Sequence, residues 1–248
     1  MKTILITGCS SGFGLEIARS FLDRPDWTVI ATMRTPRENV LPASDRLRIL
    51  ALDVTDPDSI RHAIEAAGPI DVLVNNAGIG YMNALEGTSM DMVRDVFETN
   101  VLGTMAMARA VLPQMRERRS GVVINVSSSV SLMPLPLLSV YTASKAAVNA
   151  FSDVLELELA PFNVRMRVVL PGRAPETPFS ANARSRMQAG FPEPYAEFAQ
   201  AAFAKLQQQH GPVTHASDVA DAVWRAATDP SCPMRLAAGA DAVALMPA

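Results

Sequence analysis

Short apolar segments alternate with helical segments along most of this 248-residue chain. The expected strands are residues 2–7, 28–31, 47–52, 70–74, 122–126 and 164–170. They are apolar throughout, which is typical of strands that are buried on both faces of a sheet. Strands of this kind that alternate with helices predict a parallel sheet with helices on both sides. The sequence therefore predicts an α/β fold, a doubly wound parallel sheet, in a single domain over residues 1–248.

The segment 173–213 interrupts this alternation. Prolines at positions 175, 178, 192, 194 and 212 are scattered among aromatic residues there. The segment follows the carboxyl end of a strand, where open α/β sheets bind their ligands. We interpret it as an irregular insert that forms a substrate lid. Long helices are expected at 90–118 and 141–159, a further helix at 217–228, and a last short strand within 235–248.

Charge and cysteine content exclude several classes of protein. The net charge of −3 is spread along the chain, so no basic patch for nucleic acid is expected. Cys9 and Cys232 form no pair motif, and His62, His210 and His215 have no ligand spacing, so neither a disulfide framework nor a metal site is expected. No apolar run is long enough for a membrane span or a signal peptide. We expect a cytoplasmic protein.

A glycine-rich loop, Thr7 to Gly14, joins the first strand to the first helix in a TGxxxGxG pattern. Glycines allow a tight turn and a close approach to a pyrophosphate, whose charge the free N–H groups of the helix N-terminus stabilise. The spacing differs from the GxGxxG fingerprint, and a packing role for the glycines is the alternative. The candidate cofactor-binding residues of this loop are Gly8, Ser10, Ser11, Gly12, Phe13 and Gly14.

Arg34 follows the second strand, where dinucleotide-binding chains distinguish their two cofactors. An acidic side chain there bonds the ribose of NAD, whereas an arginine nearby accommodates the 2′-phosphate of NADP. Met33 occupies the expected acidic position, and Arg34 and Arg37 come next. We therefore predict NADP(H) as the cofactor, with a surface arginine as the alternative. Asp53, at the end of the third strand, is either a ligand for the adenine amino group or a turn residue.

Tyr141 and Lys145 are four residues apart, so they lie on one face of the expected helix. The strand 122–126 runs directly into Ser127, Ser128 and Ser129, which places hydroxyl groups beside the start of that helix. A neighbouring ammonium favours the phenolate, so we expect Lys145 to lower the pKa of Tyr141. A serine hydroxyl can hydrogen-bond a substrate oxygen as charge develops on it. The alternative for the pair alone is a surface Tyr-Lys neighbour.

The order of these motifs resembles that of the short-chain dehydrogenase/reductase family. The shared motifs are the glycine loop, Asn75-Asn76-Ala77-Gly78, Asn125-Val126-Ser127-Ser128, Tyr141-Thr142-Ala143-Ser144-Lys145 and Pro171-Gly172. The resemblance covers nearly the whole chain and implies a Rossmann fold. It also implies that Tyr141 is the acid/base, that Lys145 lowers the pKa of Tyr141 and binds the nicotinamide ribose, and that Ser128 orients the substrate oxygen. Asn100, from Glu98-Thr99-Asn100-Val101, would support a proton-relay water.

The same resemblance extends the cofactor site to further residues, which are Val54, Asn76, Ala77, Gly78, Pro171, Gly172 and Thr177. Two departures from the family pattern affect these assignments. Thr177 comes one residue later than the threonine that usually meets the nicotinamide carboxamide. Ser131 stands where a glycine is common, and Ser127 and Ser129 replace Ser128 if the strand register is shifted.

These expectations define an NADP(H)-dependent carbonyl reductase or alcohol dehydrogenase. The insert carries Phe179, Met187, Phe191, Tyr195, Phe198 and Phe203, which favours a hydrophobic ketone or aldehyde as the substrate, although part of this set belongs to the core or to a subunit contact. The start of the chain looks most like the hydroxysteroid- and retinol-dehydrogenase-like branch of the family. A homodimer or homotetramer is expected, as is usual in the family. A non-catalytic NADP(H) sensor or scaffold is the alternative function, while the chain length argues against a sugar-nucleotide epimerase.

Overall fold

The protein is built on one seven-stranded sheet, seen in a computed structural model that describes residues 1–187, 190–208 and 211–246. Every neighbouring pair of strands is parallel, in the order β3-β2-β1-β4-β5-β6-β7. This confirms the doubly wound parallel sheet that the alternation predicts and the Rossmann fold that the family resemblance implies. The strands are β1 (Lys2–Ile6), β2 (Trp27–Met33), β3 (Leu47–Ala51), β4 (Val72–Asn75), β5 (Gly121–Val126), β6 (Val164–Pro171) and β7 (Arg235–Ala238).

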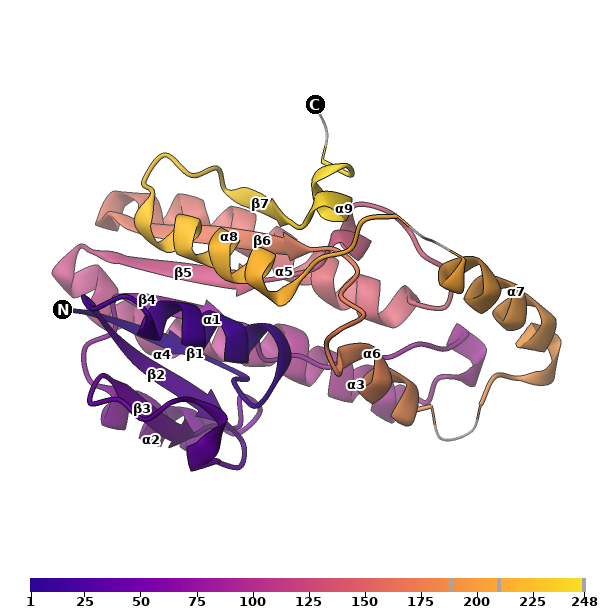
Figure 1. Ribbon diagram of the computed structural model, residues 1–248, viewed down its shortest axis with the longest axis horizontal. Coiled ribbons are helices and arrows are strands. Elements are labelled where there is room, and N and C mark those ends of the chain that lie inside the picture. The colour runs from indigo at the N-terminus through magenta and orange to yellow at the C-terminus, as the bar shows by residue number, and fades with distance from the viewer. Residues whose placement is uncertain (188–189, 209–210, 247–248) are drawn as a thin grey trace.

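Helices cover both faces of the sheet, and each face has its own hydrophobic core (Figure 1). On one face, α1 (Gly12–Leu22) and α8 (Ala216–Thr228) pack against each other and against the strands. On the other face lie α2 (Pro57–Ala67), α4 (Gly103–Arg118) and α5 (Ser139–Leu159). The central strands are buried on both sides because alternate residues point into the two cores, for example Ile4 and Leu5 of β1.

Two of the differences between the predicted and the observed elements have a clear structural reason. The expected strand at 70–74 begins at Val72, because the backbone N–H of Ile70 donates to the Gln114 side chain, at 2.9 Å, and not to a neighbouring strand. The expected helix over 90–118 is divided into α3 (Met90–Phe97) and α4 by a π-helical turn, Glu98–Leu102. Turns of this kind occur frequently at functional sites.

The insert, residues 173–213, is less irregular than the sequence predicts. It contains α6 (Phe179–Ser185) and α7 (Ala196–Gln207), and α7 lies beyond the end of the sheet, at the right of Figure 1. The prolines flank these helices, so they limit helix length without preventing helix formation. Residues 188–189 and 209–210 of the insert, with His210 among them, lie outside the described residues.

The chain ends with β7 and the short helix α9 (Ala240–Val243), in agreement with the expected last strand. Both cysteines are buried and free, and burial raises the pKa of the Cys9 thiol to about 12. Of the helices in the described ranges, none has the length and apolarity needed to cross a membrane.

Candidate active site

The order in which strands are added to the sheet reverses at β1. This strand pairs with β2 on one side and with β4 on the other. The chain thus winds outward in both directions from this point, and the carboxyl ends of β1 and β4 border a crevice. The glycine loop follows β1, Asn76 to Gly78 follow β4, and Ser127 and Ser128 follow β5. The topology therefore brings most of the predicted site residues to one edge of the sheet.

The glycine loop has the conformation that its glycines permit. Gly8 and Gly12 have φ values of 75° and 59°, a region that side-chain-bearing residues rarely adopt. A Cβ on Gly14 would lie 2.4 Å from the carbonyl oxygen of Gly8, so α1 packs against the loop only because residue 14 is a glycine. Ser11 is the N-cap of α1, but its side chain caps no backbone N–H. The loop therefore offers α1 amide groups to an anion, which fits a pyrophosphate.

Thr7 joins the glycine loop to the segment after β4. Its hydroxyl oxygen accepts hydrogen bonds from the backbone N–H groups of Asn76, at 3.0 Å, and Ala77, at 2.9 Å. The Asn76 side chain donates in return to the carbonyl oxygens of Thr7 and Gly8, at 2.9 and 3.2 Å. These four bonds fix one wall of the crevice.

Arg34 is exposed at the end of β2 and acts electrostatically on two neighbours. Burial favours a raised pKa for Asp53, but hydrogen bonds from the Thr55 N–H and hydroxyl, together with the charge of Arg34, hold that pKa below its usual value. The pKa of Arg186, which follows α6, is lowered by burial and by the charge of Arg34. Arg186 thus brings a second guanidinium near Arg34, and sequence reasoning missed it because it lies 152 positions further along the chain.

The remaining predicted cofactor residues lie within the glycine loop or border it. The carbonyl of Ser10 accepts a hydrogen bond from Arg37, Phe13 packs against the core under α1, and Val54 packs against Gly103 at the start of α4. Thr177 lies beside Gly12, because a Cβ on Gly12 would be 3.6 Å from the Cβ of Thr177. The insert therefore rests on the glycine loop at this point. Pro171 ends β6, and Gly172 follows it.

The structure brings Tyr141, Ser128 and Lys145 together in a buried position. Tyr141 is 7% exposed, and its hydroxyl shares a hydrogen bond with the Ser128 side chain. The Nζ atom of Lys145 donates to the Val126 carbonyl at 3.0 Å and lies 6.0 Å from the centre of the Tyr141 ring. The hydroxyl of Ser127 instead donates to the backbone carbonyl of Lys145, at 3.3 Å. Of the alternatives that the sequence left open, Ser128 is the one that faces Tyr141.

Burial decides the ionisation of this pair. It raises the pKa of Tyr141 to about 12, although the hydrogen bond from Ser128 opposes the shift. Burial also lowers the pKa of Lys145 to about 8. The net shift of the Tyr141 pKa is therefore upward, whereas the sequence led us to expect a downward shift. The reason is that removal from water disfavours both charged forms, and the sequence does not reveal how deeply the pair is buried.

Asn100 lies in the π-helical turn and is 1% exposed. Its side chain accepts from the Ile79 N–H at 2.8 Å and donates to the Ile79 carbonyl at 2.9 Å and to the Ser144 hydroxyl at 3.1 Å. A Cβ on Gly78 would lie 3.1 Å from Asn100 Oδ1 and 3.6 Å from Lys145 Nζ, so Gly78 leaves room for both side chains. The turn thus places Asn100 next to the lysine.

Two polar residues, Ser131 and Asn149, lie behind Ser128, and sequence reasoning missed Asn149. The Asn149 side chain donates to the Ser131 hydroxyl at 2.8 Å, and that hydroxyl donates to the Ser128 carbonyl at 2.7 Å. Ser131 is the residue that departs from the family's common glycine, and here its side chain supports the serine loop. The i, i+4 spacing that aligns Tyr141 with Lys145 continues to Asn149, and this signal was present in the sequence.

The insert contributes one aromatic side chain to the site. The ring of Phe179 packs against that of Tyr141, with centroids 5.6 Å apart. Phe191 and Phe203 pair with each other, with centroids 5.8 Å apart, while Phe198 is 53% exposed. Met187 packs in a small cluster with Tyr81, Val96 and Val140, and the Tyr195 hydroxyl donates to Glu86. The aromatic residues of the insert are thus divided between the site, internal contacts and solvent.

Two protein relatives share a large part of this sequence. The chain is 40% identical to 3-ketodihydrosphingosine reductase of Bacteroides thetaiotaomicron over 79% of this chain and 72% of the relative. It is 38% identical to human retinol dehydrogenase 8 over 69% of this chain and 58% of that protein.

Solved structures extend the similarity to nearly the whole chain. A closed form of serine dehydrogenase complexed with NADP+ has a TM-score of 0.80 and 31% identity, and covers 96% of this chain and 94% of its own. The 3-ketoacyl-(acyl-carrier-protein) reductase from Brucella melitensis, complexed with NADH, has a TM-score of 0.79 and 27% identity, and covers 95% and 96%. Residues 2–188 match the family model for short chain dehydrogenases. With this match, the fold and the relatives in agreement, the chain belongs to the short-chain dehydrogenase/reductase family of oxidoreductases.

Proposed function

We propose that this protein is an NADP(H)-dependent oxidoreductase that interconverts a hydrophobic ketone or aldehyde and its alcohol. The observation that carries the proposal is the buried Tyr141 hydroxyl, which is hydrogen-bonded to Ser128 at the carboxyl edge of the sheet, with Lys145 on the same helix face. A phenol in this position can exchange a proton with a substrate oxygen that also contacts the serine. The family and its nicotinamide-bound neighbours supply the general class of reaction.

The proton chemistry follows from the ionisation of the two buried groups. With a pKa near 12, Tyr141 holds its proton at neutral pH and can act as the acid when a carbonyl is reduced. Ser128 donates a second hydrogen bond to the same developing oxyanion. The Lys145 ammonium stabilises the phenolate that remains, because opposite charges in a buried site interact strongly. NADPH, when bound, supplies the hydride but no proton, so the protein must provide the proton.

The preference for NADP(H) is supported by charge at the end of β2. No carboxylate stands in the position of Met33, and Arg34 and Arg186 bring two guanidinium groups close together. Like charges that approach each other favour an anion between them, and arginine binds phosphate through paired N–H donors. The glycine loop, Asn76 to Gly78 and the Pro171-Gly172 turn would hold the rest of the dinucleotide.

The preference for an apolar substrate is supported by the insert, which we interpret as the substrate lid. Phe179 forms an apolar wall against the ring of Tyr141. The names of two relatives, for a ketodihydrosphingosine and for retinol, agree with a substrate that has a large apolar part.

A homodimer or homotetramer is supported by an apolar groove between α4 and α5. Leu112, Phe151, Leu155 and Leu159 line it, and Val154 and Leu157 are exposed on α5.

The test is NADPH consumption over a panel of ketones and aldehydes by the purified protein and its Tyr141→Phe variant. We expect the variant to lose a factor of about 10²–10⁴ in kcat, as is typical for removal of a general acid, and to keep its affinity for NADPH. Fluorescence titration of NADPH measures that affinity independently of turnover. Equal activity of the two proteins would contradict the mechanism. NADPH binding by the parent without turnover of any carbonyl would favour the sensor or scaffold alternative.

A further inference from the structure

The two ends of the insert meet at one point of the fold. The backbone N–H of Thr214 donates to the carbonyl of Arg173 at 2.8 Å, so the chain leaves and re-enters the sheet region through neighbouring residues. The segment between them, which carries Thr177 and Phe179, extends from this point over the glycine loop and Tyr141. Whatever fixes this point therefore fixes the base of the insert.

The side chain of Thr214 is the centre of that junction and is 1% exposed. Its hydroxyl oxygen accepts a hydrogen bond from the Gly172 N–H at 2.9 Å. Its proton lies between the carbonyl of Ala238, at 2.8 Å, and Oδ1 of Asp241, at 2.7 Å. One hydroxyl group thus connects the end of β6, the end of β7 and α9.

Asp241 completes the junction from α9. Its Oδ2 atom accepts a hydrogen bond from the Arg173 N–H at 2.6 Å, while Oδ1 accepts from Thr214. The carboxylate packs directly on the backbone of Gly172, where a Cβ would lie 2.2 Å from Oδ2. Hydrogen bonds to an ionised acceptor are roughly twice as strong as neutral ones. The Asp241 carboxylate therefore holds the Arg173 N–H and the Thr214 hydroxyl firmly in place.

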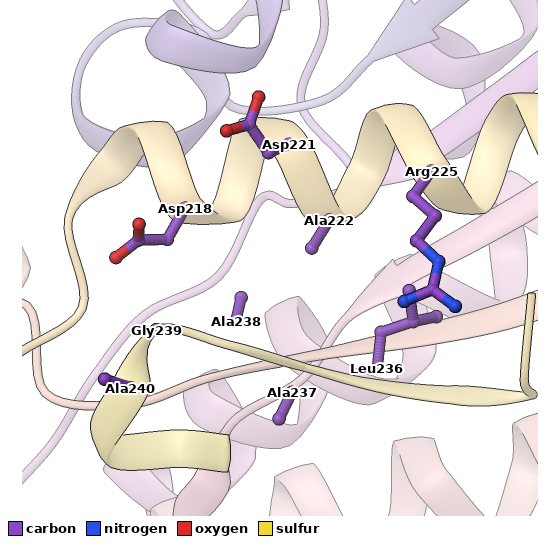
Figure 2. Close-up of a pocket in the computed structure, with 9 residues that line it drawn as sticks. All are labelled: Asp218, Asp221, Ala222, Arg225, Leu236, Ala237, Ala238, Gly239 and Ala240. Atoms are coloured by element: carbon purple, nitrogen blue, oxygen red, sulfur yellow. The ribbon is translucent and has the colours of Figure 1, made fainter.

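The chain turns at Gly239 so that Asp241 can reach this position. Gly239 has a φ of 92°, and a Cβ there would lie 2.1 Å from the Thr214 hydroxyl oxygen. Figure 2 shows this turn between Ala238 and Ala240, opposite the start of α8. Glycines at 172 and 239 are therefore required by the close approach of Asp241 and Thr214.

We propose that Thr214 and Asp241 are positioning residues for the reaction, which hold the Pro171 to Arg173 turn and the base of the insert in the arrangement that the cofactor and the carbonyl substrate need. This inference rests on the proposed function for its kinetic consequence. Neither side chain touches Tyr141 or Ser128 among the contacts of the described chain. Their effect passes through the backbone of Gly172, which follows the strand that ends at the crevice.

The experiment compares Thr214→Val, Asp241→Ala and Asp241→Asn with Thr214→Ser, which keeps the hydroxyl. The matched control is Asp221→Ala, because Asp221 is exposed on α8 and its carboxylate points away from the β7 turn in Figure 2. We expect Thr214→Val and both Asp241 variants to raise KM for NADPH about tenfold or more, corresponding to about 1.4 kcal/mol. Thr214→Ser and Asp221→Ala should stay within twofold of the parent. KM is the deciding quantity because a partly unfolded sample lowers the apparent kcat without changing KM.

A second measurement judges the junction without reference to the reaction. Limited trypsin digestion without added nucleotide should cut Thr214→Val and Asp241→Ala within residues 173–186 at least fivefold faster than the parent and Asp221→Ala. Unchanged cleavage would overturn the junction as a structural device. Faster cleavage with unchanged KM, in an active parent, would overturn the positioning role. An inactive parent that shows the cleavage difference would count against the proposed function and leave the junction supported.

Discussion

Arg34 is the residue on which the choice of dinucleotide depends. Arg34→Ala should weaken NADPH binding ten- to hundredfold, because a charge-assisted hydrogen bond contributes about 1.5–3 kcal/mol, and should leave NADH binding within twofold. Fluorescence titration with each nucleotide measures both affinities. Arg94→Ala, on the exposed face of α3, is the control and should change neither. Equal losses for NADPH and NADH would show that Arg34 does not contact the 2′-phosphate.

Lys145 illustrates a conflict between stability and function at a single residue. Its pKa of about 8 means that folding at neutral pH forces a charged group into a buried site, at a cost of about 3 kcal/mol relative to its ordinary pKa. Lys145→Met removes this penalty and also the hydrogen bond to Val126, which contributes less. The variant should therefore unfold at a temperature several degrees higher than the parent at pH 7. It should also lose catalytic activity.

The pH dependence of this difference has a definite sign. Below pH 8 both folded and unfolded parent chains carry the charge, so the full penalty is present. Between pH 8 and 10.5 the folded parent releases the proton while the unfolded chain keeps it, so the parent gains stability as pH rises. Calorimetry at pH 7 and pH 10 should show the advantage of Lys145→Met shrinking. The control Lys205→Met, on the surface of α7, should show no such trend.

At the scale of elements, α6 is seated on the loop after β4 through a glycine. A Cβ on Gly80 would lie 2.7 Å from two atoms of the Phe179 ring, which is closer than non-bonded carbon atoms approach in proteins. Gly80→Ala should push Phe179 away from Tyr141 and leave more room beside the Tyr141 ring. We expect kcat/KM for a bulky ketone, relative to a small one, to rise at least about fivefold. Gly211→Ala, where nothing lies within 4 Å, is the control, and an unchanged ratio would remove Phe179 from the substrate wall.

The elements also show where sequence reasoning succeeds and where it stops. The buried strands β1, β2, β4, β5 and β6 are predictable because a continuous apolar run is stable only where both of its faces are covered. β3 lies at the edge of the sheet and is only partly buried, which the sequence did not predict. The π-helical turn at Asn100 is not, since it depends on the pairing of that side chain with Ile79 after the chain has folded. α6 and α7 were missed because the prolines in this segment predict an irregular chain, whereas in the structure they lie outside both helices. The Tyr141 and Lys145 pair was predicted from spacing, but the direction of the Tyr141 shift depends on burial, which only the packed structure reveals.

At the scale of the whole molecule, the exposed side of α5 predicts how copies assemble. Val154 is 57% exposed and Leu157 74% exposed, beside the apolar groove that α4 and α5 form. The double variant Val154→Lys and Leu157→Lys should shift the protein to a monomer, because like charges would face each other across a symmetric interface. Light scattering after size exclusion measures the mass. Leu85→Lys, at an exposed residue far from this groove in sequence, should leave the assembly intact, and a parent that is already monomeric would refute the interface.

Because β1 is an inner strand of the sheet, the first residues of this sequence are essential to the fold. The first residues of most chains can be trimmed or extended at little cost, because they lie at the periphery. Here Lys2–Ile6 is hydrogen-bonded to β2 on one side and to β4 on the other, and joins the two halves of the sheet. Deletion of residues 1–6 would remove the strand that connects the two halves of the sheet by hydrogen bonds. Residues added before Met1 would leave these hydrogen bonds intact, because the Met1 side chain is 80% exposed.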